Sequence, residues 1–281
     1  MRAGLIQLSV SDDPVANLSA TRAFVRAAAA GGAGFVLTPE CTNILSSDRA
    51  HQRAVLQDQA TDQTLAALRA EAADLGIWLL IGSLALKTDD ADGRFANRSF
   101  LIAPDGSIAA SYDKIHMFDV DVSPTEQYRE SSGYRPGDRA VLAETPFGAV
   151  GMAVCYDLRF PQLFRTLAQD GAGILTVPAA FNDTTGAAHW EVLLRARAIE
   201  NGAYVLAPAQ CGTHAAHQGR ARRSYGHSLA VSPWGEVLVD GGTEPGVSYV
   251  DLDPAAVSTA RARVPSLAHD RPFAAPAAGA C

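Results

Sequence analysis

The sequence predicts an α/β fold in which buried strands alternate with helices. Short apolar runs rich in Val, Ile and Leu recur along the 281 residues and are separated by Gly and Pro, a pattern typical of strands that are covered on both faces. Stretches with helical spacing lie between several of these runs, which favours helices layered on sheets. Near the C-terminus, the run LAVSPWGEVLVD has the form of a hairpin and adds antiparallel strands.

These elements follow one another along the chain. The strand-like runs are GLIQLSV, FVLTPE, IWLLIGSLAL, RSFLIAP, AVGMAVCY, GILTVPAAF, AYVLAPAQC, HSLAVSP, EVLVD and VSYVDLD. Helices are expected over residues 14–30, 61–75, 161–170 and 189–201. The first of these helices follows Asp-Asp-Pro and the second begins with Thr-Asp, and both sequences are typical of helix starts.

Composition and charge limit the possible functions. Hydrophobic residues make up 48% of the chain, enough for a sizeable core, and a net charge of −7 with scattered basic residues argues against a nucleic-acid partner. The one basic cluster, GRARR at 219–223, is either a solvated loop that rims a site or a contact for an anionic ligand. Since no repeat or linker divides the chain, residues 1–272 are expected to form one domain, followed by a flexible tail at 273–281.

The N-terminus and the cysteines predict a cytoplasmic protein. The first apolar run is too short for a secretory signal, and no run approaches the roughly 18 apolar residues of a membrane span. The cysteines, at positions 41, 155, 211 and 281, form no CxxC pair and have no histidine at zinc-ligand spacing. We therefore expect free thiols, no membrane partner and no metal.

Three strand-like runs end near residues that can carry chemistry. Glu40 ends FVLTPE, Lys114 lies in SYDKIHMFDVDV, and Cys155 ends an apolar run just before Tyr-Asp-Leu-Arg. Functional groups collect at strand ends in layered α/β folds. On their own, Glu40 is compatible with a helix cap and Cys155 with a packing residue. Lys114 is a stronger indication of a catalytic role. Only two of the 23 basic residues are lysines, so the use of lysine instead of arginine at this position suggests that a compact ammonium is needed.

Together these segments resemble the nitrilase superfamily of carbon–nitrogen hydrolases, and the resemblance runs from IQLSV near the N-terminus to VPSLAHDRPF near the C-terminus. It implies a four-layer αββα sandwich. It also implies that Glu40 is a general base, Lys114 a transition-state stabiliser and Cys155 the nucleophile. The family has a second glutamate in the loop after the lysine, which we assign to Glu130, with Glu126 as the alternative.

The chemistry of these groups supports the same roles. A free thiol has a pKa of about 8.5 and needs a base or a cation to attack well at neutral pH. Glu40 can take the thiol proton and then activate the water that hydrolyses a thioester, and we expect burial and Glu130 to raise its pKa for this task. Lys114 and the backbone N–H of Tyr156 can form an oxyanion hole. No cofactor is needed.

Further segments resemble the branch of small-amide amidases that includes deaminated glutathione amidase and omega-amidase. They are CYDLRFPQLFR, PAAFNDTTGAAHWEVLLRARAIEN, AQCG, SYGHS and PWGE. The resemblance implies a substrate pocket formed by Arg159, Tyr156, Phe181 and Asn182. It also implies an ω-amide of a carboxylate-bearing acid, such as deaminated glutathione, as substrate, with 2-oxoglutaramate-type amides or an aliphatic nitrile as alternatives. Gln162 and Asn182 depart from residues common in relatives, so the acyl group stays open.

Arg159 has two interpretations. A planar guanidinium suits a substrate carboxylate bidentately, and Arg159 lies shortly after Cys155 on the same segment. The alternative is a structural salt bridge to Asp157. The resemblance favours the substrate-binding role.

Two other functions are disfavoured. GHSLA at 226–230 is close to the GxSxG nucleophile elbow, but a strand-like run rather than a helix follows Ser228. A binding protein that had kept only the fold would not need all four catalytic side chains. The resemblance further implies a homodimer or a larger homo-oligomer, with residues 189–201 and the helix that starts at Pro161 as candidate interface elements.

Overall fold

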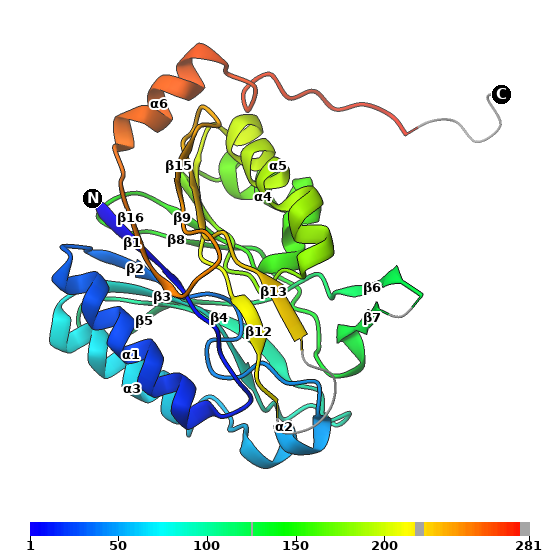
Figure 1. Cartoon of the computed structure of the whole chain (residues 1–281). Helices are drawn as coiled ribbons and strands as arrows, with labels where there is room; N and C mark the ends of the chain where they lie inside the picture. The colour runs from blue at the N-terminus through cyan, green and yellow to red at the C-terminus, as the bar shows by residue number, and fades with distance from the viewer. Residues whose placement is uncertain (125, 217–221, 276–281) are drawn as a thin grey trace.

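The computed structural model of the chain describes residues 1–124, 126–216 and 222–275. Two six-stranded sheets face each other. Helices α1 and α3 cover the outer face of one sheet, and α4 and α5 cover the outer face of the other (Figure 1). The α/β class and the four-layer αββα sandwich expected from the sequence are therefore confirmed.

The helices agree closely with the expected ones at three positions. They are α1 (Pro14–Ala30), α2 (Arg49–Val55), α3 (Gln63–Leu75), α4 (Pro161–Gln169), α5 (Asp183–Asn201) and α6 (Pro254–Arg263). The helix expected from residue 189 begins earlier, at Asp183, because the Asn182 side chain caps it by accepting a hydrogen bond from the Thr185 N–H. Helices α2 and α6 were not predicted, although each follows an aspartate cap, Asp48 or Asp253.

Each sheet has parallel strands at its centre and antiparallel strands outside them. The first sheet, in the order β16-β1-β2-β3-β4-β5, contains β1 (Arg2–Gln7), β2 (Phe35–Leu37), β3 (Trp78–Leu86), β4 (Ala96–Ile102), β5 (Ile108–Asp113) and β16 (Gly246–Asp251). The second, in the order β15-β14-β11-β10-β9-β8, contains β8 (Val141–Ala143), β9 (Val150–Met152), β10 (Ile174–Thr176), β11 (Tyr204–Ala207), β14 (Leu229–Val231) and β15 (Val237–Asp240). The antiparallel β14–β15 pair confirms the predicted hairpin.

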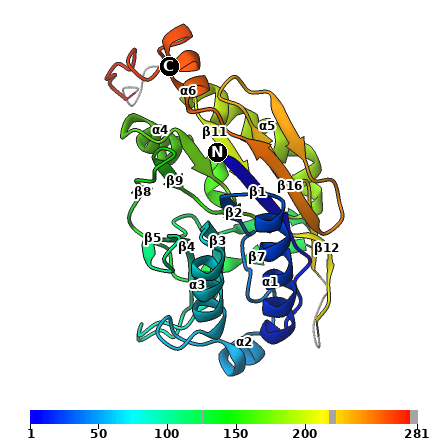
Figure 2. The same cartoon turned by 90° about the vertical axis from the view of Figure 1, so that its left-hand side faces the viewer.

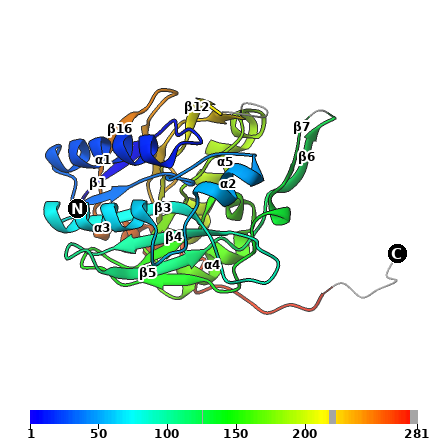
Figure 3. The same cartoon turned by 90° about the horizontal axis from the view of Figure 1, so that it is seen from below.

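Two smaller antiparallel pairs lie outside these sheets. They are β6 (Asp119–Ser123) with β7 (Glu126–Arg129), and β12 (Cys211–His214) with β13 (Arg222–Tyr225). The β6–β7 pair projects from the body of the molecule (Figure 3). Neither pair was predicted, because neither contains a long apolar run. Both contribute walls to the cavity described below.

Side chains of the first sheet alternate between two cores. Leu37 and Leu80 point toward the second sheet, whereas Val36 and Leu79 pack against the layer of α1 and α3. These two helices lie side by side on the outer face (Figure 2). The central strands are thus buried on both faces, as their continuous apolar composition predicted.

Part of the predicted organisation falls outside the described residues. Positions 276–281 of the expected tail and 219–221 of the basic cluster belong to that part, while Phe273 is 91% exposed. Within the described ranges, no helix combines the length and the apolar composition that crossing a membrane requires.

Gly82 of β3 lies against the segments that follow β2 and β10. Its N–H donates to Thr38 Oγ1 at 3.0 Å. A Cβ placed on Gly82 would lie 2.1 Å from the Thr38 carbonyl oxygen and 2.5 Å from the Cβ of Pro178. Thr38 lies two residues before Glu40 in the sequence. Pro178 is linked to Cys155, because its carbonyl oxygen accepts the N–H of Cys155 at 2.9 Å. Only a glycine therefore lets these two segments meet.

We expect Gly82→Ala to separate the segments that carry Glu40 and Cys155. The overpacking should lower the free energy of unfolding by about 1–3 kcal/mol and reduce turnover together with it. Denaturant unfolding and initial rates measure both effects. The matched control is Gly246→Ala in β16, where a new Cβ meets no described atom within 4 Å. Equal behaviour of the two variants would contradict the close-approach argument.

Candidate active site

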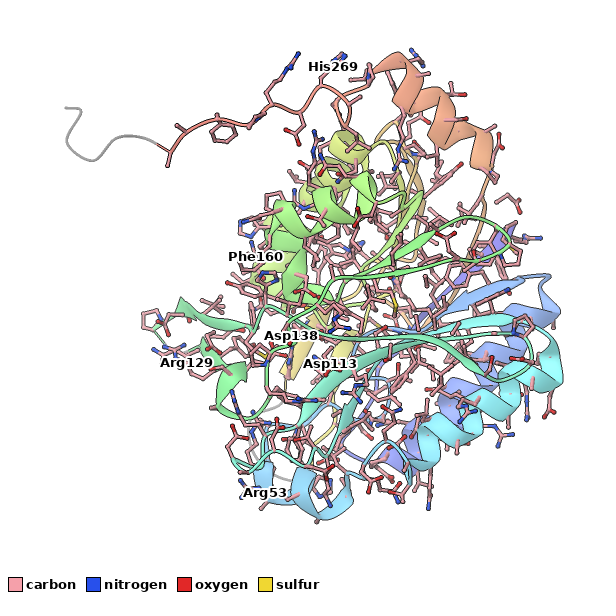
Figure 4. All side chains as sticks on the ribbon, turned by 180° about the vertical axis from the view of Figure 1, so that it is seen from behind. Arg53, Asp113, Arg129, Asp138, Phe160 and His269 are labelled. Atoms are coloured by element: carbon pink, nitrogen blue, oxygen red, sulfur yellow. The ribbon has the colours of Figure 1, made fainter. Side chains whose placement is uncertain are left out.

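A cavity of about 830 Å³ opens where the ends of the strands meet. Its walls come from the segments that follow β2, β5, β9 and β10 and from the β6–β7 and β12–β13 pairs. Figure 4 places Arg129 on the projecting β6–β7 pair, at the outer part of this wall. Among the residues predicted from the sequence, Glu40, Lys114, Cys155 and Glu130 all line the cavity. The structure therefore brings these residues, which come from different segments of the chain, into one cavity, as the argument from the strand ends predicted.

Glu40 is buried and fully hydrogen-bonded. Its Oε1 accepts from Lys114 Nζ at 2.9 Å and from Asn97 Nδ2 at 2.9 Å. Its Oε2 accepts from the backbone N–H of Ala180 at 2.8 Å. Contacts from three separate segments fix the carboxylate, because a buried charge is tolerated only when it is paired and hydrogen-bonded.

Lys114 lies between two carboxylates. Besides Glu40, its Nζ contacts both oxygens of Glu130, at 2.9 and 2.8 Å. Glu130 also accepts from the backbone N–H of Phe118 at 2.6 Å. Glu126, the alternative second glutamate, instead accepts from the Tyr128 hydroxyl and from Asn182 Nδ2, both at 2.7 Å. The structure thus brings Glu130, and not Glu126, to the lysine.

The charges of this group set its protonation. Burial acts to lower the pKa of Lys114, but Glu130 and Glu40 raise it well above the ordinary value. Burial acts to raise the pKa of Glu40, but the Lys114 ammonium and further partners hold it below the ordinary value. The expectation of a raised Glu40 pKa is therefore wrong, because the ammonium stands between Glu40 and Glu130.

Cys155 occupies a strained turn at the end of β9. Its φ of 51° lies in the left-handed region that residues with a side chain rarely adopt. It opens a 3₁₀ turn (Cys155–Arg159) and lines the cavity. Burial and the neighbouring Glu40 raise the pKa of its thiol well above the ordinary value, against the opposing effect of Lys114. The resting sulfur is therefore protonated and needs a base to become a nucleophile.

Asp157 ties this turn to the segment that carries Lys114. Its Oδ2 accepts from the Tyr112 hydroxyl at 2.7 Å and from the Val154 N–H at 2.9 Å. Its Oδ1 contacts the backbone N–H and the ring Nδ1 of His116, at 3.0 and 2.7 Å. The carboxylate is fully buried. It thereby fixes the position of Cys155 relative to Lys114, and it is not a salt-bridge partner of Arg159.

Three of the four predicted substrate-binding residues line the cavity, and the fourth does not. Tyr156, Phe181 and Asn182 line the cavity, and Asn182 also caps α5. Arg159 does not belong to the lining. Its guanidinium lies 5.4 Å from the Phe181 ring centroid and 5.9 Å from that of Tyr156, and it contacts His189 Nδ1 at 3.3 Å. Arg159 therefore packs near two aromatic rings of the wall without lining the cavity itself, and its role in binding substrate stays a prediction.

Two residues of the site were missed by sequence reasoning. Asn97 donates through Nδ2 to both Glu40 and Glu130, the second at 3.3 Å. The feature that could have revealed Asn97 is a polar side chain within the strand ANRSFLI, at a buried position where an apolar side chain is expected. Arg222 on β13 also lines the cavity, and the basic cluster that contains it had been singled out with an anionic contact as one interpretation.

The competing serine elbow lies elsewhere. Ser228 is buried and leads into strand β14, and its hydroxyl accepts the Ala209 N–H at 2.9 Å. It does not line the cavity. In the described ranges, no cluster of three or more His, Cys, Asp or Glu side chains has metal-site spacing.

Comparisons with known proteins agree with this geometry. The model of the carbon-nitrogen hydrolase family matches residues 2–262. The chain is 40% identical to a deaminated glutathione amidase of Yersinia enterocolitica over 85% of its own length and 82% of the relative. It is 37% identical to human omega-amidase over 94% of its length and 92% of the relative. The Caenorhabditis elegans NitFhit crystal structure superposes with a TM-score of 0.88 at 34% identity, over 96% of this chain and 65% of that one.

The direction of the Glu40 pKa shift predicts the pH dependence of this site. A base must be ionised to accept the thiol proton, so a pKa below the ordinary glutamate value of about 4.3 keeps kcat/KM flat down to that pH. The contribution of the ionised Glu40 to stability is likewise present above its unfolded pKa and lost as the pH falls through its lower folded pKa. A pH profile of kcat/KM, with folding monitored at each pH, measures this. An acid limb near pH 6 in folded protein would contradict it.

Proposed function

Because the chain belongs to the carbon–nitrogen hydrolase family, we propose that it is a thiol amidohydrolase that cleaves small linear amides through a cysteine thioester. The observation that carries the proposal is the buried group of Glu40, Lys114 and Glu130 beside Cys155. This group supplies a base, a cation and a nucleophile in one cavity.

The proposed reaction has two steps. Glu40 takes the thiol proton as the Cys155 sulfur attacks the amide carbonyl carbon, and the C–N bond then breaks while Glu40 gives that proton to the leaving amine. Next, Glu40 takes a proton from water, and the hydroxide attacks the thioester carbon. The C–S bond breaks, the acid leaves, and the sulfur regains a proton from Glu40.

Lys114 and the backbone N–H of Tyr156 are proposed to stabilise the oxyanion. Lys114 Nζ contacts three carboxylate oxygens, two of them from Glu130. A substrate oxygen can replace one of the two Glu130 contacts while the other keeps the ammonium in place. Glu130 therefore orients the lysine without holding all of its donors.

The proposed substrate is an ω-amide of a carboxylate-bearing acid, such as deaminated glutathione. Two relatives carry the names deaminated glutathione amidase and omega-amidase. A cavity of about 830 Å³ is in the range of sites for drug-sized ligands and leaves room beyond a five-carbon amide. Amides of the 2-oxoglutaramate type and aliphatic nitriles are the alternatives. A reactive thiol suits a reducing compartment, and we propose the cytoplasm.

Ammonia or amine release from a panel of amides and one aliphatic nitrile tests the activity. We expect turnover of carboxylate-bearing amides and an acyl-group mass increase on Cys155 in acid-quenched protein. Cys155→Ala should lower kcat by at least about 10³-fold, as for other nucleophiles that act as a unit with their base. The matched control is Cys211→Ala, a buried free cysteine outside the cavity. Full activity of Cys155→Ala would reject the mechanism.

We also propose that the chain forms a homodimer through the face of α5. Val192 and Ile199 on this helix are 67% and 56% exposed, and Trp234 in the adjacent β14–β15 turn is 46% exposed. Arg195 Nε donates to the Gly235 carbonyl at 2.9 Å, so this turn lies against the helix. Contiguous exposed apolar side chains of this kind mark association sites.

Light scattering tests the dimer at micromolar concentration. The wild type should give twice the chain mass of 29.5 kDa, and Ile199→Asp should shift the equilibrium toward one chain. Val15→Asp is the matched control, because Val15 is 73% exposed on α1 in the opposite helix layer. A monomeric wild type would reject the proposal.

A further inference from the structure

The cavity contains a cation that the proposed mechanism does not use. Arg222, the first residue of β13, donates from Nη2 to the carbonyl oxygen of Ala180. Its guanidinium carbon lies 5.5 Å from the Tyr128 ring centroid. Its Nε is buried and has no hydrogen-bond partner among the described residues, and it forms no ion pair with any of them. An inward guanidinium is thus left with unused donors.

The neighbouring arginine differs in each of these respects. Arg223 is 68% exposed at its side chain and forms an ion pair with Asp183. Arg129 likewise pairs with Asp121 in an exposed position. A buried N–H without a hydrogen-bond acceptor is unfavourable unless a ligand supplies one. The planar donors of a guanidinium match the two oxygens of a carboxylate. The contacts of Arg222 therefore fit a carboxylate of the substrate.

The position of Arg222 decides which half of the substrate it faces. Ala180, whose carbonyl receives Arg222, donates its own N–H to Glu40 Oε2 at 2.8 Å. Glu40 must hand its proton to the amine that departs, so the amine half of the substrate lies against Glu40. Arg222 is on that same side. Arg159, by contrast, lies near the rings of Phe181 and Tyr156, on the segment of Cys155, and does not line the cavity.

Other charges around Arg222 leave a single place for a carboxylate. Glu40 and Glu130 carry two negative charges against the single ammonium of Lys114. Burial acts to lower the pKa of Arg222 and the nearby Glu40 charge raises it, but among the described residues no hydrogen bond joins either carboxylate to the guanidinium. Glu126 lies at the far end of Tyr128, whose hydroxyl donates to it at 2.7 Å. An acidic group on the substrate is therefore attracted toward Arg222 and repelled from the wall that contains Glu126.

We propose that Arg222 binds the carboxylate carried by the leaving amine of such a substrate, so that this one residue determines how strongly the enzyme prefers an amide with a carboxylate on its amine half over a primary amide. This inference rests on the amidohydrolase function proposed above. It assigns one residue of the basic cluster, Arg222, to an anionic ligand contact. It also accounts for a cavity larger than a five-carbon amide requires, because the remaining volume holds the departing half of the substrate.

Three substrates with one 2-oxoglutaryl acyl group test the assignment. They are deaminated glutathione, the same compound with its glycine carboxylate converted to a carboxamide, and 2-oxoglutaramate, from which ammonia leaves. The wild type should prefer the free carboxylate over the carboxamide. Arg222→Gln should reduce that preference by roughly 10- to 100-fold, the effect of losing a hydrogen bond to a charged group, mainly through KM. Arg222→Lys should retain part of it.

Arg223→Gln is the matched control and should keep the wild-type preference, because Arg223, although it also lines the cavity, is exposed and already paired with Asp183. Thermal unfolding and turnover of 2-oxoglutaramate report whether each variant keeps an intact triad. A wild type without preference for the carboxylate, or equal losses on both peptide substrates in Arg222→Gln, would overturn the role of Arg222 while leaving the amidohydrolase proposal standing. A wild type that cleaves none of the three would overturn both.

Discussion

The ammonium of Lys114, held out of water between two carboxylates, is the interaction on which the rest of the site depends. A buried lysine is stable only with compensating charge, and two buried carboxylates this close together are stable only with a cation between them. Glu40, Lys114 and Glu130 come from separate segments, so the ion group forms only when both halves of the first sheet and the loop beyond it are in place. Asn97 bridges the two carboxylates and limits their separation.

The nucleophile is positioned by a second, independent set of contacts. The Pro178 carbonyl fixes the N–H of Cys155, and Asp157 joins the 3₁₀ turn to Tyr112 and His116 on either side of Lys114. His116 in turn stacks on Phe160, with ring centroids 3.5 Å apart. The strained backbone of Cys155 is maintained because these hydrogen bonds over-determine it.

The sequence was sufficient for the elements that depend on local composition. Continuous apolar runs identified the central strands, and the residues at their ends identified Glu40, Lys114 and Cys155. The start of α5 was missed because its first turn, Asp-Thr-Thr-Gly, contains no large apolar residue to reveal helical spacing. The roles of Asn97 and Asp157 could not be predicted, since each depends on side chains from segments far away in the chain. The direction of the Glu40 pKa shift was also out of reach, because it depends on the Lys114 ammonium lying between the two carboxylates.

The raised pKa of the Cys155 thiol affects how readily the sulfur is oxidised while the enzyme is not turning over. Peroxides and other oxidants attack the thiolate, and the first product, a sulfenic acid, leads on to irreversible acids. A sulfur that is buried and protonated at rest enters this series slowly. Because its proton leaves only toward Glu40 during attack on a carbonyl carbon, the arrangement that makes Cys155 dependent on a base also protects it from oxidative damage.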